Sequence, residues 1–191
     1  MPRLAPPLRH LIFVYGTLKR GLINHERYLA LAEEHGAARF VGGGVTTERF
    51  PLIVLPTERY SRQPPALLER RGVGNRVRGE LFVVDDRTLE GLDILEGLHV
   101  GQYYKGSVDV TLDEGVDAVA AGVEPEASAA GAPSSCAVEA TCYFFPASDT
   151  LLAQPMHPEY DAARYELYQP AADPNEQIVE LCRPVPVDYV E

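Results

Sequence analysis

Residues 11–21 (LIFVYGTLKRG) constrain the fold more than any other stretch of this chain. Four consecutive apolar residues open the stretch, which is typical of a strand buried on both faces. The strand stops at Tyr15-Gly16-Thr17-Leu18, where Gly16 allows backbone angles closed to other residues and a close approach to the main chain. The stretch therefore predicts a buried strand that carries a short loop with free backbone N–H groups.

A loop of this kind is suited to a small anion. Lys19 and Arg20 follow it directly, and N–H donors together with positive charge satisfy a carboxylate. The chain has 17 Lys and Arg against 28 Asp and Glu, a net charge of −11, so a pocket for an anion has to be locally basic. The plainer alternative is a tight turn with both cations in solvent.

The same negative charge disfavours nucleic acid and anionic membranes as partners. The length of 191 residues, 46% of them hydrophobic, allows one domain with one sizeable core. Cys136, Cys142 and Cys182 form no CxxC pair, so we expect reduced thiols in the cytoplasm and no metal site. No apolar run approaches the roughly 20 residues that cross a bilayer.

A second informative segment joins a strand at residues 78–84 to a helix at 87–96, with Asp85 or Asp86 as its N-cap and Gly97 after its end. Helical spacing places Glu96 on the same face as Leu89 and Leu92, in the stripe that should be apolar. Loss of water raises the pKa of such a carboxyl towards the range useful for proton transfer. Alternatively, Glu96 reaches solvent at the helix end or pairs with an arginine.

These two segments, FVYGTLKRG followed by Asn24-His25, and GELFVVDDRTLEGLDILEG, resemble the gamma-glutamyl cyclotransferase-like superfamily, and most closely its gamma-glutamylamine cyclotransferases. The resemblance implies that Glu96 is the catalytic acid and base and that Asp93 supports the helix end. It also implies that the loop binds the gamma-glutamyl or 5-oxoproline moiety through Tyr15, Gly16, Thr17 and Leu18.

Tyr103 and Lys105 match the family's Tyr-x-Arg/Lys pattern, with Lys in place of the commoner Arg. We place Tyr103 among the substrate-binding residues, where it either donates a hydrogen bond at the pocket rim or packs. His25 and His35 are expected on the surface of a helix that Asn24 caps and that runs to about residue 35.

The remaining segments complete an α+β domain, a small mixed β-barrel flanked by short helices, and the resemblance implies the same barrel. Strands are expected at residues 39–47, broken by three glycines, and at 51–55, 102–112 and 138–145; residues 56–76 read as a loop. We expect residues 1–10 to be a flexible lead-in. Residues 11–146 should form the domain, with a disordered insertion at 113–135. Residues 147–191 should form an extension that packs on the domain and carries a strand at 178–182.

The resemblance predicts a gamma-glutamylamine cyclotransferase, which releases 5-oxoproline and a free amine from small-molecule substrates such as gamma-glutamyl-lysine without a cofactor. One alternative is a gamma-glutamyl cyclotransferase that acts on gamma-glutamyl amino acids. An alternative of another class is a non-catalytic module that binds a carboxylate or a peptide.

Overall fold

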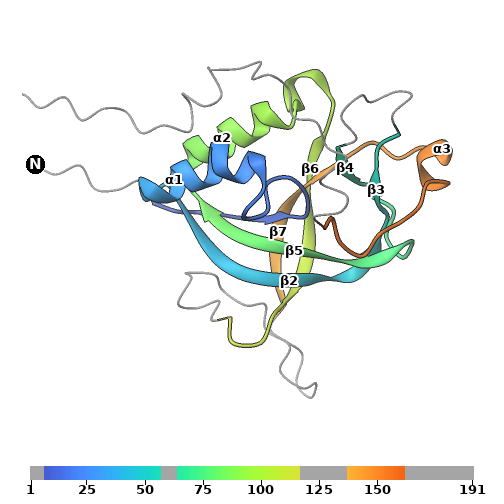
Figure 1. The fold of residues 1–191 in the computed structure, drawn as a ribbon, viewed down its shortest axis with the longest axis horizontal. Helices are drawn as coiled ribbons and strands as arrows, with labels where there is room; N and C mark the ends of the chain where they lie inside the picture. The colour runs from blue at the N-terminus through green and yellow to red at the C-terminus, as the bar shows by residue number, and fades with distance from the viewer. Residues whose placement is uncertain (1–6, 57–63, 117–136, 162–191) are drawn as a thin grey trace, which may run out of the picture.

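The computed structural model describes residues 7–56, 64–116 and 137–161, in which five strands close into a β-barrel (Figure 1). Neighbouring strands in the order β1-β5-β2-β6-β7 are antiparallel, and the barrel closes where β7 pairs in parallel with β1. The predicted α+β barrel is confirmed. Its strands are β1 (His10–Val14), β2 (Ala38–Phe50), β5 (Asn75–Val84), β6 (Tyr104–Leu112) and β7 (Ala137–Phe144).

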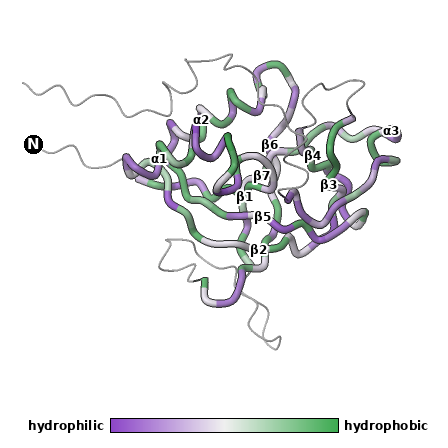
Figure 2. The backbone as a smooth tube through the Cα atoms, viewed as in Figure 1, coloured by the Kyte–Doolittle hydropathy of each residue, from purple (hydrophilic) through white to green (hydrophobic). Residues whose placement is uncertain are grey.

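The first strand is buried on both faces, as its apolar run predicts. Ile12 packs in a cluster with the helices, whereas Phe13 packs in a second cluster inside the barrel. This division follows from the two-residue period of a strand, which sends successive side chains to opposite faces. Figure 2 shows apolar residues along β1, near the middle of the view, and along β3, towards its right-hand side.

The second strand, β2, is continuous over 13 residues, and its glycines lie within it rather than ending it. Its pairing with β5 shifts between Phe40 and Gly42 and again between Val45 and Arg49, so β2 is irregular at these two places but is not broken by its glycines. At Gly44 the backbone of β2 lies close to that of β6: an added Cβ would sit 2.8 Å from the carbonyl oxygen of Thr111. The glycines therefore allow β2 to bend around the barrel between β5 and β6.

The helices lie together on one side of the barrel, and the small sheet with α3 lies at the opposite end (Figure 1). A π-helical turn, η1, leads directly into the first short helix, and a left-handed Gly36 follows that helix. The predicted helix is present, but Asn24 is not its cap, because its backbone is already helical (φ −76°, ψ −26°). His25 is buried against Phe82 rather than on the surface. These elements are η1 (His25–Leu29), α1 (Ala30–Glu34), α2 (Asp86–Leu95), η2 (Leu98–Val100) and α3 (Asp149–Leu152).

The expectation of a loop over residues 56–76 is wrong in part. β4 (Pro65–Leu67) pairs with β3 (Leu52–Val54), and β5 already begins at Asn75. The amide of Phe145, just after β7, donates to the carbonyl of Leu67 at 2.8 Å and fixes this small sheet to the barrel. Residues 57–63 lie outside the described part of the chain.

The segment after β7 returns across the barrel. The amide of His157 donates to Leu52 in β3, and the amide of Arg78 in β5 donates to Pro158, both at 2.8 Å. Tyr160 is 1% exposed within the barrel cluster. The predictions for residues 1–6, for the insertion from residue 117 onward and for the strand at 178–182 fall outside the described residues.

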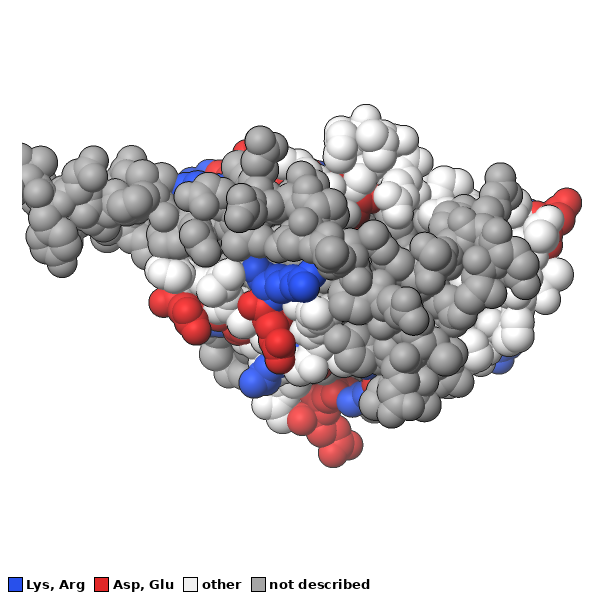
Figure 3. Space-filling view, turned by 45° about the horizontal axis from the view of Figure 1, so that its top comes forward, with Lys and Arg blue, Asp and Glu red and all other residues white. Residues whose placement is uncertain are grey.

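Within the described residues, every helix is too short or too polar to cross a membrane. On the face shown in Figure 3, acidic and basic side chains alternate in small groups. Ion pairs among the described residues include Arg78 with Asp113, whose Nη2 and Oδ2 atoms lie 2.6 Å apart.

Candidate functional site

A cavity of about 390 Å³ opens between the loop after β1, the helices and β7. It brings together the residues that the sequence assigned to catalysis and to binding of the glutamyl moiety, although they come from positions 15 to 103 of the chain. Those residues are Tyr15, Gly16, Thr17, Leu18, Glu96 and Tyr103.

The loop after β1 is a compact turn that leaves its first amides available. The amide of Lys19 donates to the carbonyl of Gly16 at 3.0 Å, and Asn24 Nδ2 donates to Thr17 Oγ1 at 2.8 Å. No described group accepts a hydrogen bond from the amides of Gly16, Thr17 or Leu18. The turn therefore presents N–H donors next to the cavity, as a site for a carboxylate or an oxyanion requires.

Gly16 is required at this turn by its neighbour on β4. A Cβ added to Gly16 would lie 2.5 Å from Cγ of Pro65, a buried residue of the small sheet. Atoms at that separation overlap, so any side chain here would displace either the turn or β4. The close approach also explains how β4, which the sequence did not predict, helps to position the loop.

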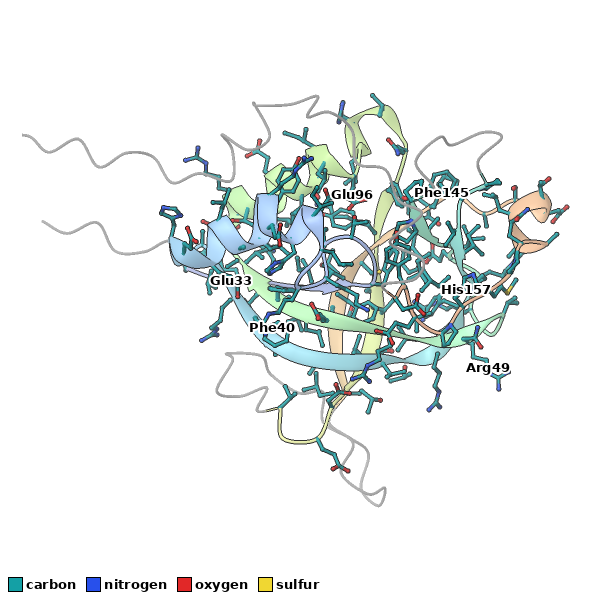
Figure 4. The ribbon with its side chains drawn as sticks, viewed as in Figure 1. Glu33, Phe40, Arg49, Glu96, Phe145 and His157 are labelled. Carbon is teal, nitrogen blue, oxygen red and sulfur yellow. The ribbon has the colours of Figure 1, made fainter. Side chains whose placement is uncertain are left out.

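Glu96 lies at the C-terminal end of α2. At the N-terminal end, the Asp85 side chain caps the helix by accepting a hydrogen bond from the Thr88 amide at 2.7 Å. The Glu96 amide still donates to Leu92 at 2.9 Å, and Gly97 then turns the chain with a left-handed φ of 67°. This combination ends the helix immediately after Glu96. The carboxylate thus projects from the end of a fixed helix, beside the loop after β1 in the interior seen in Figure 4.

The Glu96 side chain is half-buried, since the cavity is its route to solvent. Burial raises the pKa of its carboxyl from an ordinary value of 4.5 to about 7. A charged carboxylate is poorly solvated in such a site, and the protonated form gains by comparison. Near neutral pH, Glu96 is therefore present in both forms, so it can both accept and donate a proton.

Two tyrosines line the cavity with their hydroxyls engaged. Tyr15 donates to the carbonyl of Tyr143 at 2.8 Å, and Tyr103 donates to the carbonyl of Pro65 at 3.0 Å. Burial, with Tyr103 and Glu96 nearby, holds the pKa of Tyr15 well above its usual value. The Tyr15 phenol consequently stays neutral. Tyr103 both donates its hydrogen bond and packs against Phe145.

Asp93 lies one helical turn before Glu96 and organises this end of α2. Its Oδ1 accepts a hydrogen bond from the Tyr143 hydroxyl and its Oδ2 accepts one from Lys105 Nζ, both at 2.7 Å. Burial and this hydrogen bond raise the pKa of the Tyr143 phenol. The carboxylate thereby connects α2 to β6 and β7, as the sequence resemblance led us to expect of a supporting residue.

The two cations predicted to serve the pocket do not reach it. Lys19 Nζ contacts Glu159 Oε1 at 2.6 Å, and the Arg20 guanidinium lies 4.3 Å above the ring of Phe40. Arg27, on η1, and His99, on η2, line the cavity instead. Helical spacing indicates this position for Arg27, which is three residues after Asn24 on the same helix face.

Together these groups offer backbone donors on one wall and a proton-transferring carboxyl on another. Among the described residues, His, Cys, Asp and Glu side chains form no cluster suited to a metal ion. The arrangement can hold a carboxylate-bearing molecule and move a proton on and off it.

Comparison with known proteins agrees with this geometry. The family described as gamma-glutamyl cyclotransferase, AIG2-like, matches residues 12–162, which extends past residue 146 into the segment that crosses the barrel. The crystal structure of an AIG2-like protein from Mus musculus has a TM-score of 0.63 and 30% identity, and the match covers 86% of this chain and 99% of that one.

Two curated relatives have a higher identity over a shorter part of the chain. A Drosophila melanogaster protein named provisionally as a gamma-glutamylcyclotransferase is 49% identical over 85 residues, 44% of this chain and 50% of that protein. A gamma-glutamylaminecyclotransferase from Rattus norvegicus is 45% identical over 86 residues, 45% of this chain and 54% of that protein. The chain thus spans about half the length of these two relatives.

Proposed function

Because the chain belongs to the gamma-glutamyl cyclotransferase, AIG2-like family, we propose that it is an enzyme that converts gamma-glutamyl amines into 5-oxoproline and a free amine. The substrate is a small gamma-glutamyl compound such as gamma-glutamyl-lysine, in which the glutamyl side-chain carbonyl is bonded to an amine. The name of the rat relative supports an amine leaving group, and the sparse, unpaired cysteines support a cytoplasmic setting.

The reaction needs a base first. In the ionised state, Glu96 accepts a proton from the alpha-ammonium of the glutamyl group. The neutral nitrogen then attacks the delta-carbonyl carbon, and a five-membered ring forms with negative charge on the carbonyl oxygen. Nucleophile and carbonyl belong to the same molecule, so holding the glutamyl chain folded supplies much of the rate acceleration.

The reaction then needs an acid. The protonated Glu96 donates its proton to the departing nitrogen, and the bond from the carbonyl carbon to that nitrogen breaks. The ring nitrogen, which still carries an extra proton after its attack, loses that proton to Glu96, and Glu96 passes it to the released amine. The products are 5-oxoproline with one N–H and the leaving amine as an ammonium ion, and Glu96 is ionised again. Tyr15, Gly16, Thr17, Leu18 and Tyr103 surround the glutamyl moiety in this proposal. The free amides of the loop stabilise the alpha-carboxylate or the developing oxyanion, in the manner of an oxyanion hole.

One observation carries this proposal: a half-buried carboxyl with a pKa of about 7 lines the same cavity as a turn whose amides at Gly16, Thr17 and Leu18 have no acceptor among the described residues. A module that only binds a carboxylate has no need of a second carboxyl in the pocket, because like charges repel. A single residue that is half ionised near neutral pH serves these proton transfers.

The test is release of 5-oxoproline from gamma-glutamyl-lysine by the purified full-length chain, measured by mass spectrometry. Ring closure predicts 5-oxoproline rather than glutamate as the product. Glu96→Gln keeps the size of the side chain and should lower kcat/KM by about 10²- to 10⁴-fold. Glu90→Gln, at an exposed position of the same helix, is the matched control and should keep the full rate.

Full activity of Glu96→Gln would remove Glu96 from the mechanism. A panel of gamma-glutamyl amines and gamma-glutamyl amino acids then decides between the two kinds of substrate. Absence of turnover across the whole panel, with binding retained, would leave the non-catalytic module as the correct description.

A further inference from the structure

Arg27 is the charged group of the cavity that the proposed chemistry leaves without a task. It is half-buried, it lines the cavity from η1, and it takes part in none of the ion pairs found among the described residues. A guanidinium held in a partly buried position in a chain of net charge −11 needs an anionic or hydrogen-bonding partner.

Glu96 is not that partner. The two side chains line one cavity but form no ion pair, and burial raises the pKa of Glu96 without a cation to counteract it. An arginine next to a carboxylate would lower the pKa instead. Arg27 and Glu96 therefore lie at separate places in the cavity.

The substrate then has to span that separation. The alpha-amino group of the glutamyl moiety must reach Glu96, so the alpha-carboxylate attached to the same carbon stays near the loop amides. Asn24 donates to Thr17 of the loop at 2.8 Å, and Arg27 follows in the π-helical turn η1 and lines the cavity from there. With the glutamyl end of the substrate at the loop and at Glu96, Arg27 is the lining cation available to the departing amine.

We infer that Arg27 is a specificity residue that binds a carboxylate on the leaving amine, so the enzyme favours gamma-glutamyl compounds whose amine is itself an amino acid. This inference rests on the proposed function and refines its substrate class. Arginine is suited to the task because its planar guanidinium binds both oxygens of a carboxylate. Apart from Glu96, which the proposed chemistry uses, the described lining offers Arg27 and His99 and no further acidic side chain to a second positive charge on the leaving amine.

A matched pair of substrates tests the inference. Gamma-glutamyl-lysine linked through Nε and gamma-glutamylcadaverine differ only in the carboxylate of the leaving amine. The wild-type chain should favour the lysine compound in kcat/KM by roughly tenfold to a hundredfold, the range of a charged hydrogen bond. Arg27→Gln should lose that advantage on the lysine compound and keep its rate on the cadaverine compound.

Two further variants complete the design. Arg27→Lys keeps the positive charge but not the planar fork, so it should retain part of the preference. Arg76→Gln removes an exposed arginine of β5 outside the cavity and should leave both rates unchanged. Circular dichroism of each variant establishes that it is folded before its rates are compared.

The outcomes separate the inference from the proposed function. Equal losses on both substrates in Arg27→Gln would assign Arg27 to the common glutamyl carboxylate and overturn the inference, as would a wild-type chain that shows no preference. Turnover of neither substrate by the wild-type chain would instead overturn the proposed function and the inference together.

Discussion

The Tyr143 hydroxyl donates a hydrogen bond of 2.7 Å to Oδ1 of Asp93, joining the last barrel strand to the helix that carries Glu96. Lys105 donates to the other oxygen of the same carboxylate at 2.7 Å. Asp93 therefore has partners on two strands, while Glu96 follows one turn later on the same helix. The position of Glu96 therefore depends on Asp93, which does not itself line the cavity.

We expect Asp93→Ala to lower both stability and activity. The substitution leaves the Tyr143 hydroxyl and the Lys105 ammonium without their acceptor, which costs about 1–3 kcal/mol in the free energy of unfolding. Because the end of α2 is less well held, kcat should fall more than KM rises. Urea unfolding and steady-state kinetics measure the two effects.

Tyr143→Phe provides the control, because it removes one donor and should cost about 1 kcal/mol. In the double variant, the two effects should be less than additive, since the substitutions remove the same hydrogen bond. Strictly additive effects would contradict the role given to this contact.

The pH dependence of catalysis should follow the titration of Glu96. Below a pKa of about 7 the carboxyl is protonated and cannot accept the ammonium proton, so kcat/KM should fall about tenfold for each pH unit on the acid side. The check is kcat/KM between pH 5 and 9 in buffers of constant ionic strength. A flat profile between pH 5.5 and 8 would show that another group is the base.

The same group makes stability depend on pH. The pKa of Glu96 is raised from 4.5 to about 7 by folding, so between these values the folded chain binds more protons than the unfolded chain. Stability should then fall as pH rises from about 4.5 to 7 and level off above, with a total change of up to about 3 kcal/mol from this residue.

Glu96→Gln removes that titration and should be more stable than wild type at pH 8 while equal to it at pH 4. The difference in the free energy of unfolding, measured by urea denaturation at each pH, isolates the effect. Glu90→Gln, on the exposed side of the helix, should show no such difference. An equal difference at both values of pH would mean that burial does not perturb the Glu96 carboxyl.

Gly16→Ala should destabilise the loop that supplies the amides. The new methyl group would lie 2.5 Å from Pro65 Cγ, and relief of that overlap should cost about 1–3 kcal/mol and move the loop away from the cavity. Thermal unfolding and KM for the gamma-glutamyl substrate report the two consequences.

Gly21→Ala is the comparison, because nothing lies within 4 Å of the added Cβ there. Its positive φ of 78° should cost on the order of 1 kcal/mol without affecting KM. If both variants behave alike, the contact between Gly16 and Pro65 does not position the loop.

The elements that sequence periodicity determines were predictable. β1 and α2 lie where their apolar patterns indicate, because each pattern must satisfy one burial geometry over several residues. Glu96 stood out for the same reason: it was the one polar residue in a stripe that should have been apolar.

Features that depend on distant partners were not predictable. β4 has three residues and exists because β3 pairs with it, so its own sequence contains little signal. Lys19 was assigned to the pocket because it follows the loop, but its direction is decided by Glu159, 140 positions away. Arg27 is the cation that lines the cavity instead, from the turn η1, which follows the loop in the chain.

The parallel pairing of Ile12 in β1 with Thr141 in β7 has a consequence for folding during synthesis on the ribosome. β1, which carries the loop, is synthesised before the other strands of the barrel, whereas its parallel partner β7 leaves the exit tunnel after all of them. Until then, the apolar edge of β1 has no neighbour in that direction and is open to wrong pairings. The barrel, and with it the cavity, can therefore close only late in synthesis, once β7 is available to pair with β1.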